Sequence, residues 1–162
     1  MFSIVAIKEE HARDILTWQY PLPYDFYNPP QDGRDAFYVD QFLRPEFAFH
    51  AILDETGNFI GFCSFGIDGQ VAGGDYSRQA LDIGLGMRPT YTGQGYGACF
   101  FETIEHYAVR KFDPESVRLT VATFNRRAMR LYRSFGYHDV SKFTDASYDV
   151  DYIILIKCLA TG

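Results

Sequence analysis

The sequence is poor in cysteine, in positive charge and in long apolar runs. Its three cysteines among 162 residues form no C-x-x-C pair, and their odd number does not fit a secreted disulfide framework. The formal net charge of −6 argues against a nucleic-acid-binding surface. No apolar run approaches the ~18 residues that a membrane-spanning helix needs, and no basic segment opens the chain as in a signal peptide. We therefore expect a cytoplasmic protein with neither nucleic-acid nor membrane partners.

The composition instead predicts a folded globular protein. Hydrophobic residues make up 47% of the chain and aromatic residues 17%, which excludes disorder. A length of 162 residues predicts a single domain, 1–162, whose core needs no disulfide or metal. Cys63, Cys99 and Cys158 are expected to be small buried residues in a reducing cytoplasm. No His, Cys and Asp cluster has zinc-ligand spacing, so no metal is expected.

Hydrophobic periodicity predicts the secondary structure. Strands are expected at 4–7, 47–53, 59–65, 81–87, 117–121, 137–143 and 150–159, and helices at 8–18, 34–43, 97–112 and 125–135. The turn sequence at 54–58 predicts a hairpin, and Asn125 and Gly136 suit the N-cap and C′ positions of the last helix. The order β-α-α-β-β-β-α-β-α-β-β predicts an α/β fold, with a mixed central sheet flanked by helices.

The most informative segment is a glycine-rich loop between a strand and a helix. Gly93, Gly95 and Gly97 let the backbone turn tightly and approach a ligand closely, because no Cβ intervenes. Free N–H groups at the start of the following helix, together with the helix dipole, favour a phosphate or pyrophosphate there. The alternative is a tight turn that binds nothing.

Two familiar nucleotide motifs fit this loop poorly. The chain has no Gly-Lys-Ser/Thr, which a P-loop requires. The dinucleotide pattern G-x-G-x-x-G/A is formally met by Gly93, Gly95 and Ala98, but residues 88–92 separate the strand from the first glycine. The end of the next strand, 122–125, also lacks the acid that would bind ribose. An NAD-dependent oxidoreductase is therefore the third choice among functions.

Two segments resemble signatures of one family. Residues 88–97, RPTYTGQGYG, resemble the pyrophosphate loop Arg/Gln-x-x-Gly-x-Gly/Ala of the GCN5-related N-acetyltransferases (GNAT). Residues 125–137, NRRAMRLYRSFGY, resemble that family's Asn-x-x-Ala-x-x-x-Tyr-x-x-x-Gly-Phe. Thr92 departs from the pattern, because the family usually has Arg or Gln there to help hold phosphate. The resemblance implies a mostly antiparallel central sheet, acetyl-CoA as acetyl donor, and direct transfer to a primary amine in a ternary complex.

The resemblance also implies which residues bind the acetyl donor. They are Leu85 and Met87, whose free backbone groups would pair with the pantetheine amides, the loop residues Thr92, Gly93, Gln94, Gly95, Tyr96, Gly97 and Ala98, and Asn125 and Tyr132 of the last helix. The small face that Gly84 and Gly86 give to their strand fits a ligand crossing the sheet there.

Catalysis would need an acid for the departing thiolate and a base for the amine. Tyr132 is the implied acid, since a phenol can protonate a thiolate; the alternative is a place in the helix's apolar stripe. Asp82 resembles the position of the family's acidic base, the alternative being a solvated acid near a strand end. Poorer candidates for the base are Glu46, His50 and the pair Glu102 and His106, which has the i, i+4 spacing of an exposed pair.

The acceptor side is less defined. The aromatic loop 18–27, with Tyr24 and Tyr27, and the acidic segment 145–151 fall where similar enzymes build their acceptor pocket. Aromatic faces and carboxylates suit a cationic amine, whether a small molecule or a peptide. The same residues also fit an ordinary surface rim or a homodimer contact. The leading hypothesis is thus an N-acetyltransferase, and its rival is a non-catalytic acyl-CoA-binding module of the same fold.

Overall fold

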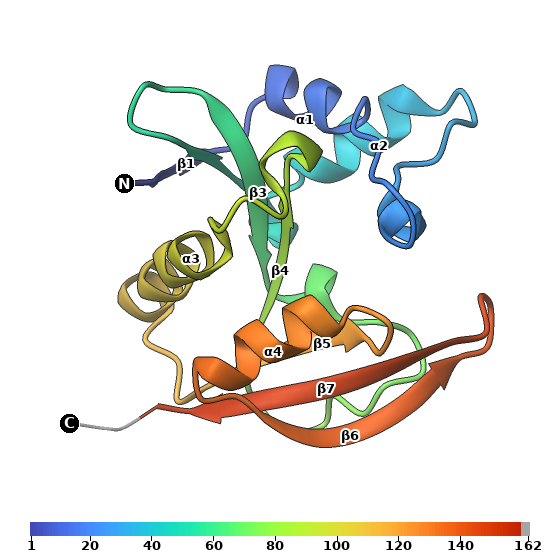
Figure 1. The fold of residues 1–162 in the computed structure, drawn as a ribbon, viewed down its shortest axis with the longest axis vertical. Helices are drawn as coiled ribbons and strands as arrows, with labels where there is room; N and C mark the ends of the chain where they lie inside the picture. The colour runs from blue at the N-terminus through green and yellow to red at the C-terminus, as the bar shows by residue number, and fades with distance from the viewer. Residues whose placement is uncertain (160–162) are drawn as a thin grey trace. The chain divides into compact units, whose positions relative to one another are not determined.

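The computed structural model describes residues 1–159 and shows an α/β fold (Figure 1). Its strands are β1 (Ser3–Ala6), β2 (His50–Leu53), β3 (Phe59–Phe65), β4 (Leu81–Met87), β5 (Ser116–Ala122), β6 (His138–Asp145) and β7 (Val150–Cys158). Its α-helices are α1 (Glu9–Ile15), α2 (Asp35–Leu43), α3 (Gly97–Phe112) and α4 (Arg126–Ser134). Within the described residues the strands form one seven-stranded sheet in the order β1-β2-β3-β4-β5-β7-β6. The predicted element order and the mixed, mostly antiparallel sheet are confirmed.

The chain divides into two compact units. The first unit comprises residues 1–64 and 85–107, and the second comprises residues 65–84 and 108–162. The prediction of a single folding domain stays a prediction, and each unit is described by itself. Among the described residues, none of the helices is both long and apolar enough to cross a membrane.

The first unit combines an antiparallel β1–β2–β3 ladder with two packed helices. The side chain of Asp54 closes the β2–β3 turn, accepting from the backbone N–H groups of Thr56 and Asn58, both at 2.9 Å. This is the predicted hairpin. A small core joins α1 and α2 through Ala12, Leu16, Val39, Tyr38 and Phe42.

Strand β2 begins later than predicted, at His50 instead of residue 47. The reason is local: residues Pro45–Phe47 form a 3₁₀ turn, and Ala48 takes a left-handed conformation with φ 48°. Proline fixes its own φ in the helical range, so the segment turns before it can extend.

The second unit contains α4 and the strands β5, β7 and β6. Strand β5 pairs antiparallel with β7 along its whole length, and β7 pairs antiparallel with β6. Asn125 caps α4 as predicted, its Oδ1 accepting from the N–H of Ala128 at 3.1 Å. Gly136 follows the helix at φ 95°, and the N–H of Tyr137 then reaches back to the carbonyl of Tyr132 at 3.1 Å.

The cysteine prediction holds for one residue of three. Cys63 is buried in β3, and desolvation raises the pKa of its thiol well above the ordinary value. Cys99 and Cys158 are exposed, so their prediction as buried residues is wrong. Cys99 follows the start of α3 and Cys158 ends β7, and the apolar character of a thiol does not by itself decide which face of an element is covered.

Candidate active site

The glycine-rich loop lies in the first unit and has the open geometry that an anion needs. Gly93 and Gly95 take positive φ angles of 72° and 87°, a conformation that glycine adopts at no steric cost. A Cβ built on Gly95 would meet no atom within 4 Å, so the space beside it is empty. Residues 93–96 are exposed.

The loop leads directly into α3, a helix of 16 residues. The N–H of Phe100 donates to the carbonyl of Tyr96 at 2.9 Å, which begins the helical ladder. The N–H groups of the preceding turn, Gly97, Ala98 and Cys99, are those that a helix start leaves without intrahelical partners. With the helix dipole, they fit a pyrophosphate.

The side chain of Thr92 stabilises the turn that precedes these glycines. Its hydroxyl donates to the carbonyl of Pro89 at 2.7 Å, across the 3₁₀ turn Pro89–Tyr91. Its side chain is thus engaged with the backbone of its own loop. The side chain of Gln94 in the same loop is exposed.

The end of β4 presents one edge to β3 and the other edge away from it. The N–H of Arg88 donates to the carbonyl of Ile60 in β3 at 2.8 Å. Because backbone groups of successive residues point to opposite sides of a strand, those of Leu85 and Met87 point away from β3. In the second unit, the described parallel ladder between β4 and β5 consists of the pairs Leu81–Val117 and Asp82–Arg118.

The sequence predicts that the backbone groups of Leu85 and Met87 are free at this outer edge, but the carbonyl of Met87 already accepts a hydrogen bond. The hydroxyl of Tyr20 donates to the carbonyl oxygen of Met87 at 2.7 Å. Desolvation raises the pKa of Tyr20 to about 12, so its hydroxyl keeps the proton that it donates. The sequence placed Tyr20 in an aromatic loop, but 67 residues separate it from its partner and no local pattern predicts the contact.

Packing against Phe62 explains the glycine at position 86 of β4. A Cβ on Gly86 would come within 2.5 Å of the ring of Phe62, so Gly86 makes room for this phenyl ring. The sequence interpretation, a ligand crossing at the small face, is therefore wrong at Gly86, where Phe62 occupies the space.

Arg88 fastens the same strand end to α1. Its guanidinium forms an ion pair with Asp14, and its Nε donates to the carbonyl of Phe59 at 2.9 Å. The guanidinium carbon lies 5.1 Å from the centre of the Trp18 ring. Arg88 is therefore a structural residue that positions the start of the glycine-rich loop.

In the second unit, Asp82 is part of a buried ion pair. The Nε and Nη2 atoms of Arg118 donate to its two carboxylate oxygens at 2.7 and 2.8 Å, and Gln70 donates to the second oxygen at 3.0 Å. Asp82 is 3% exposed and Arg118 is 2% exposed. The ion pair with Asp82 raises the pKa of Arg118. The expected alternative, a solvated acid, is wrong.

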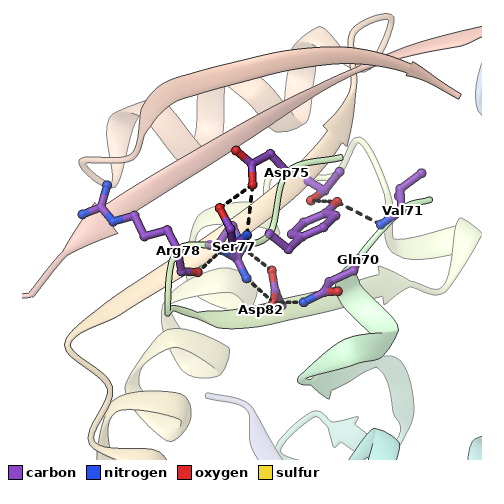
Figure 2. A network of polar contacts seen from close by, with 9 residues as sticks. Gln70, Val71, Asp75, Ser77, Arg78 and Asp82 are labelled. Carbon is purple, nitrogen blue, oxygen red and sulfur yellow. Dashed lines mark hydrogen bonds and ion pairs between the residues drawn. The ribbon is translucent and has the colours of Figure 1, made fainter. Parts of the chain in front are cut away.

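A network of polar contacts around Asp82 and Gln70 holds the segment before β4 (Figure 2). The Nη1 atom of Arg118 donates to the carbonyl of Arg78 at 2.6 Å, and the guanidinium of Arg118 lies 4.9 Å from the centre of the Tyr76 ring. The hydroxyl of Tyr76 accepts from the N–H of Val71 at 2.9 Å and bonds Thr120 at 2.8 Å. These contacts favour a structural role for Asp82 and disfavour its predicted role as general base.

The poorer candidates for the base are also engaged. His50 bonds the carbonyl of Ala48 through Nδ1 at 2.7 Å and the hydroxyl of Tyr107 through Nε2 at 3.0 Å. Glu102 and His106 form the exposed i, i+4 pair that their spacing predicts, at 3.9 Å.

Tyr132 lies on the buried side of α4, with 7% of its surface exposed. Its ring contacts that of Tyr137, with centroids 6.4 Å apart. Asn125 caps the same helix, so one short element carries two of the residues that the sequence assigned to the acetyl donor. Burial fits a place in the apolar stripe and is equally compatible with a shielded proton donor.

The predicted acceptor segments lie in different units. Tyr24 and Tyr27 bound a 3₁₀ turn in the first unit, and Tyr27 is 39% exposed with its ring edge-on to Phe26. Trp18 is 4% exposed and belongs to the aromatic core. In the second unit, Asp145 is buried and accepts from the N–H of Ser147 at 2.8 Å, closing the β6–β7 turn.

Comparisons with known proteins agree with this geometry. A family model described as the acetyltransferase (GNAT) family matches residues 10–137. A search of curated proteins finds no match. A GNAT-family acetyltransferase from Bacillus anthracis is 11% identical, with a TM-score of 0.73 over 97% of this chain and 94% of its own. A variant of the spermidine N-acetyltransferase from Vibrio cholerae is 15% identical, with a TM-score of 0.70 over 97% of this chain and 93% of its own. At these identities the structural likeness establishes the fold.

Proposed function

Since the chain belongs to the acetyltransferase (GNAT) family, we propose that it transfers the acetyl group of acetyl-CoA directly to a primary amine in a ternary complex. The observation that carries the proposal is the glycine-rich loop of the first unit. Left-handed Gly93 and Gly95, open space beside Gly95 and the start of a long helix together suit a pyrophosphate.

The glycine-rich loop and the end of β4, both in the first unit, would hold the acetyl donor. Backbone N–H groups of residues 93–98 would bind the pyrophosphate, and the outer edge of β4 at Leu85 and Met87 would pair with the pantetheine amides. Asn125 would contact the same arm while its Oδ1 continues to cap α4. Acetyl-CoA, when bound, supplies an activated thioester; the chain supplies its orientation.

Tyr132 is the residue that we assign to the departing thiolate. A phenol has an ordinary pKa of about 10 and a thiol one of about 8.5, so a phenol can lend a proton to a thiolate. Its buried position in α4 limits access of water to that proton. With Asp82 held by Arg118, the amine would lose its proton to solvent rather than to a buried carboxylate.

For the acceptor we propose a cationic amine recognised by aromatic side chains. Tyr24 and Tyr27 of the first unit would offer ring faces to it. Several similar structures are described as spermidine N-acetyltransferases, which makes a polyamine a sensible first acceptor to test.

The test is release of free thiol from acetyl-CoA, measured over a panel containing spermidine, small primary amines and a lysine peptide. We expect at least one amine to accelerate thiol release above the rate without acceptor. Stabilisation by CoA with no acceleration by any amine would contradict catalysis and favour the acyl-CoA-binding module.

A further inference from the structure

One hydrogen bond joins a loop of the first unit, residues 20–28, to the strand that leads into the glycine-rich loop. Tyr20 begins this loop 20–28, and its hydroxyl donates to the carbonyl oxygen of Met87 at 2.7 Å. Met87 is the last residue of β4, and its carbonyl points away from β3. The bond therefore lies on the strand edge that the proposed function gives to acyl-CoA.

Hydrogen bonds join the two ends of the loop, so a change at Tyr20 affects the whole loop. The side chain of Asn28 accepts from the N–H of Tyr20 at 2.6 Å and donates to the side chain of Gln19 at 3.1 Å. Within the loop, the N–H of Asn28 donates to the backbone carbonyl of Asp25 at 3.0 Å. Bonds across the two ends of a short loop reduce its independent motion, so a displacement at Tyr20 is shared by residues 24–28.

We propose that Tyr20 is a positioning residue that couples the two substrate sites: acyl-CoA bound along β4 orders the loop 20–28, through the bond between Tyr20 and Met87. The inference rests on the proposed function, because it takes β4 as the acyl-CoA strand. The loop carries Tyr24 and Tyr27, so binding of the acetyl donor would also favour an ordered acceptor side.

The chemistry of the carbonyl allows this coupling. A carbonyl oxygen has two lone pairs, so Met87 can keep Tyr20 as a donor while its edge pairs with a ligand amide. A ligand that holds the end of β4 in one conformation also holds the acceptor of the Tyr20 bond. By linkage, the opening of the loop then becomes less favourable when the ligand is present.

A second tyrosine of the first unit bonds the segment that follows the loop. Tyr38 donates its hydroxyl to Asp32 at 2.6 Å, which fastens the segment after the loop to α2. Tyr38 is thus a matched control: it is a tyrosine of the same unit whose hydroxyl bonds Asp32, in the segment that follows the loop.

The experiment is amide hydrogen exchange on the full chain with and without saturating CoA, for wild type, Tyr20→Phe and Tyr38→Phe. In wild type, we expect CoA to slow exchange both at residues 85–98 and at residues 20–28, the latter by about fivefold or more. Tyr20→Phe should keep the protection at 85–98 and lose that at 20–28. Tyr38→Phe should behave as wild type does.

The outcomes separate the two proposals. CoA protection of residues 20–28 that is equal in Tyr20→Phe and wild type would overturn the coupling while leaving the proposed function intact. No protection of residues 85–98 in wild type would overturn both. If Tyr20→Phe does not fold, Asn28→Ala gives a second test, because it opens the loop and should remove protection of residues 24–28 only.

Discussion

The buried pair of Asp82 and Arg118 allows a quantitative test of what Asp82 does. In Asp82→Asn the neutral amide leaves the Arg118 guanidinium, which is 2% exposed, buried without its counter-charge. Removing one partner of a buried ion pair costs about 3–5 kcal/mol. For a chain of this size each kcal/mol lowers Tm by about 2–4 °C, so we expect a loss of roughly 6–20 °C.

Thermal unfolding followed by circular dichroism measures this loss, with Asp139→Asn as the matched control. Asp139 pairs with Arg133 at 2.7 Å, but both side chains are more than 40% exposed, and such a pair is worth less than about 1 kcal/mol. The double variant Asp82→Asn/Arg118→Met should recover part of the loss, because no charge then stays buried. A Tm of Asp82→Asn within about 2 °C of wild type, together with a large fall in kcat, would refute the structural account and restore Asp82 as the general base.

Three further predictions concern tyrosines. Tyr132→Phe keeps the ring and removes the proton donor, so kcat should fall by about 10²–10⁴-fold with CoA affinity unchanged; a rate within about twofold of wild type would make Tyr132 structural. Tyr24→Ala/Tyr27→Ala should raise the acceptor KM and leave the Kd for CoA unchanged, whereas equal damage to both would assign the loop to folding or to an oligomer contact. The pKa of Tyr20 in the folded protein, about 12, lies above its ordinary value of 10, so stability present below pH 10 should fall as the pH rises towards 12. At pH 11, the free energy of unfolding of wild type, measured with urea, should have fallen by ~1.4 kcal/mol more than that of Tyr20→Phe. Equal falls in the two proteins would contradict the raised pKa of Tyr20.

Local signals in the sequence predicted much of this fold. Asn125 and Gly136 mark the two ends of α4 because a cap and a left-handed C′ residue act within one helical turn. Residues 54–58 mark a hairpin for the same reason, since the bonds of Asp54 stay inside the turn. The glycine-rich loop could also be predicted from the sequence, because its tight backbone conformation depends on the glycines themselves.

The parts of the candidate site that the sequence missed depend on distant partners. Asp82 has the same local pattern whether it is solvated or paired, and its partner Arg118 is 36 residues away. The bond from Tyr20 to Met87 spans 67 residues. Gly86 fits a ligand crossing as well as it fits the Phe62 ring, and only the packed structure distinguishes the two.

The most direct test of the account is CoA binding to Gly95→Val, with Gly57→Val as the control. The two glycines have nearly the same backbone conformation, φ 87° and 88°, and an added side chain meets no atom within 4 Å at either position. The strain of a β-branched residue is therefore matched at the two positions. Gly57 belongs to the β2–β3 turn and not to the glycine-rich loop. Calorimetric titration with CoA should show wild-type affinity for Gly57→Val and no measurable binding for Gly95→Val, because the valine side chain fills the space that the pyrophosphate requires. Equal CoA affinity in both variants would contradict the assignment of this loop to acyl-CoA.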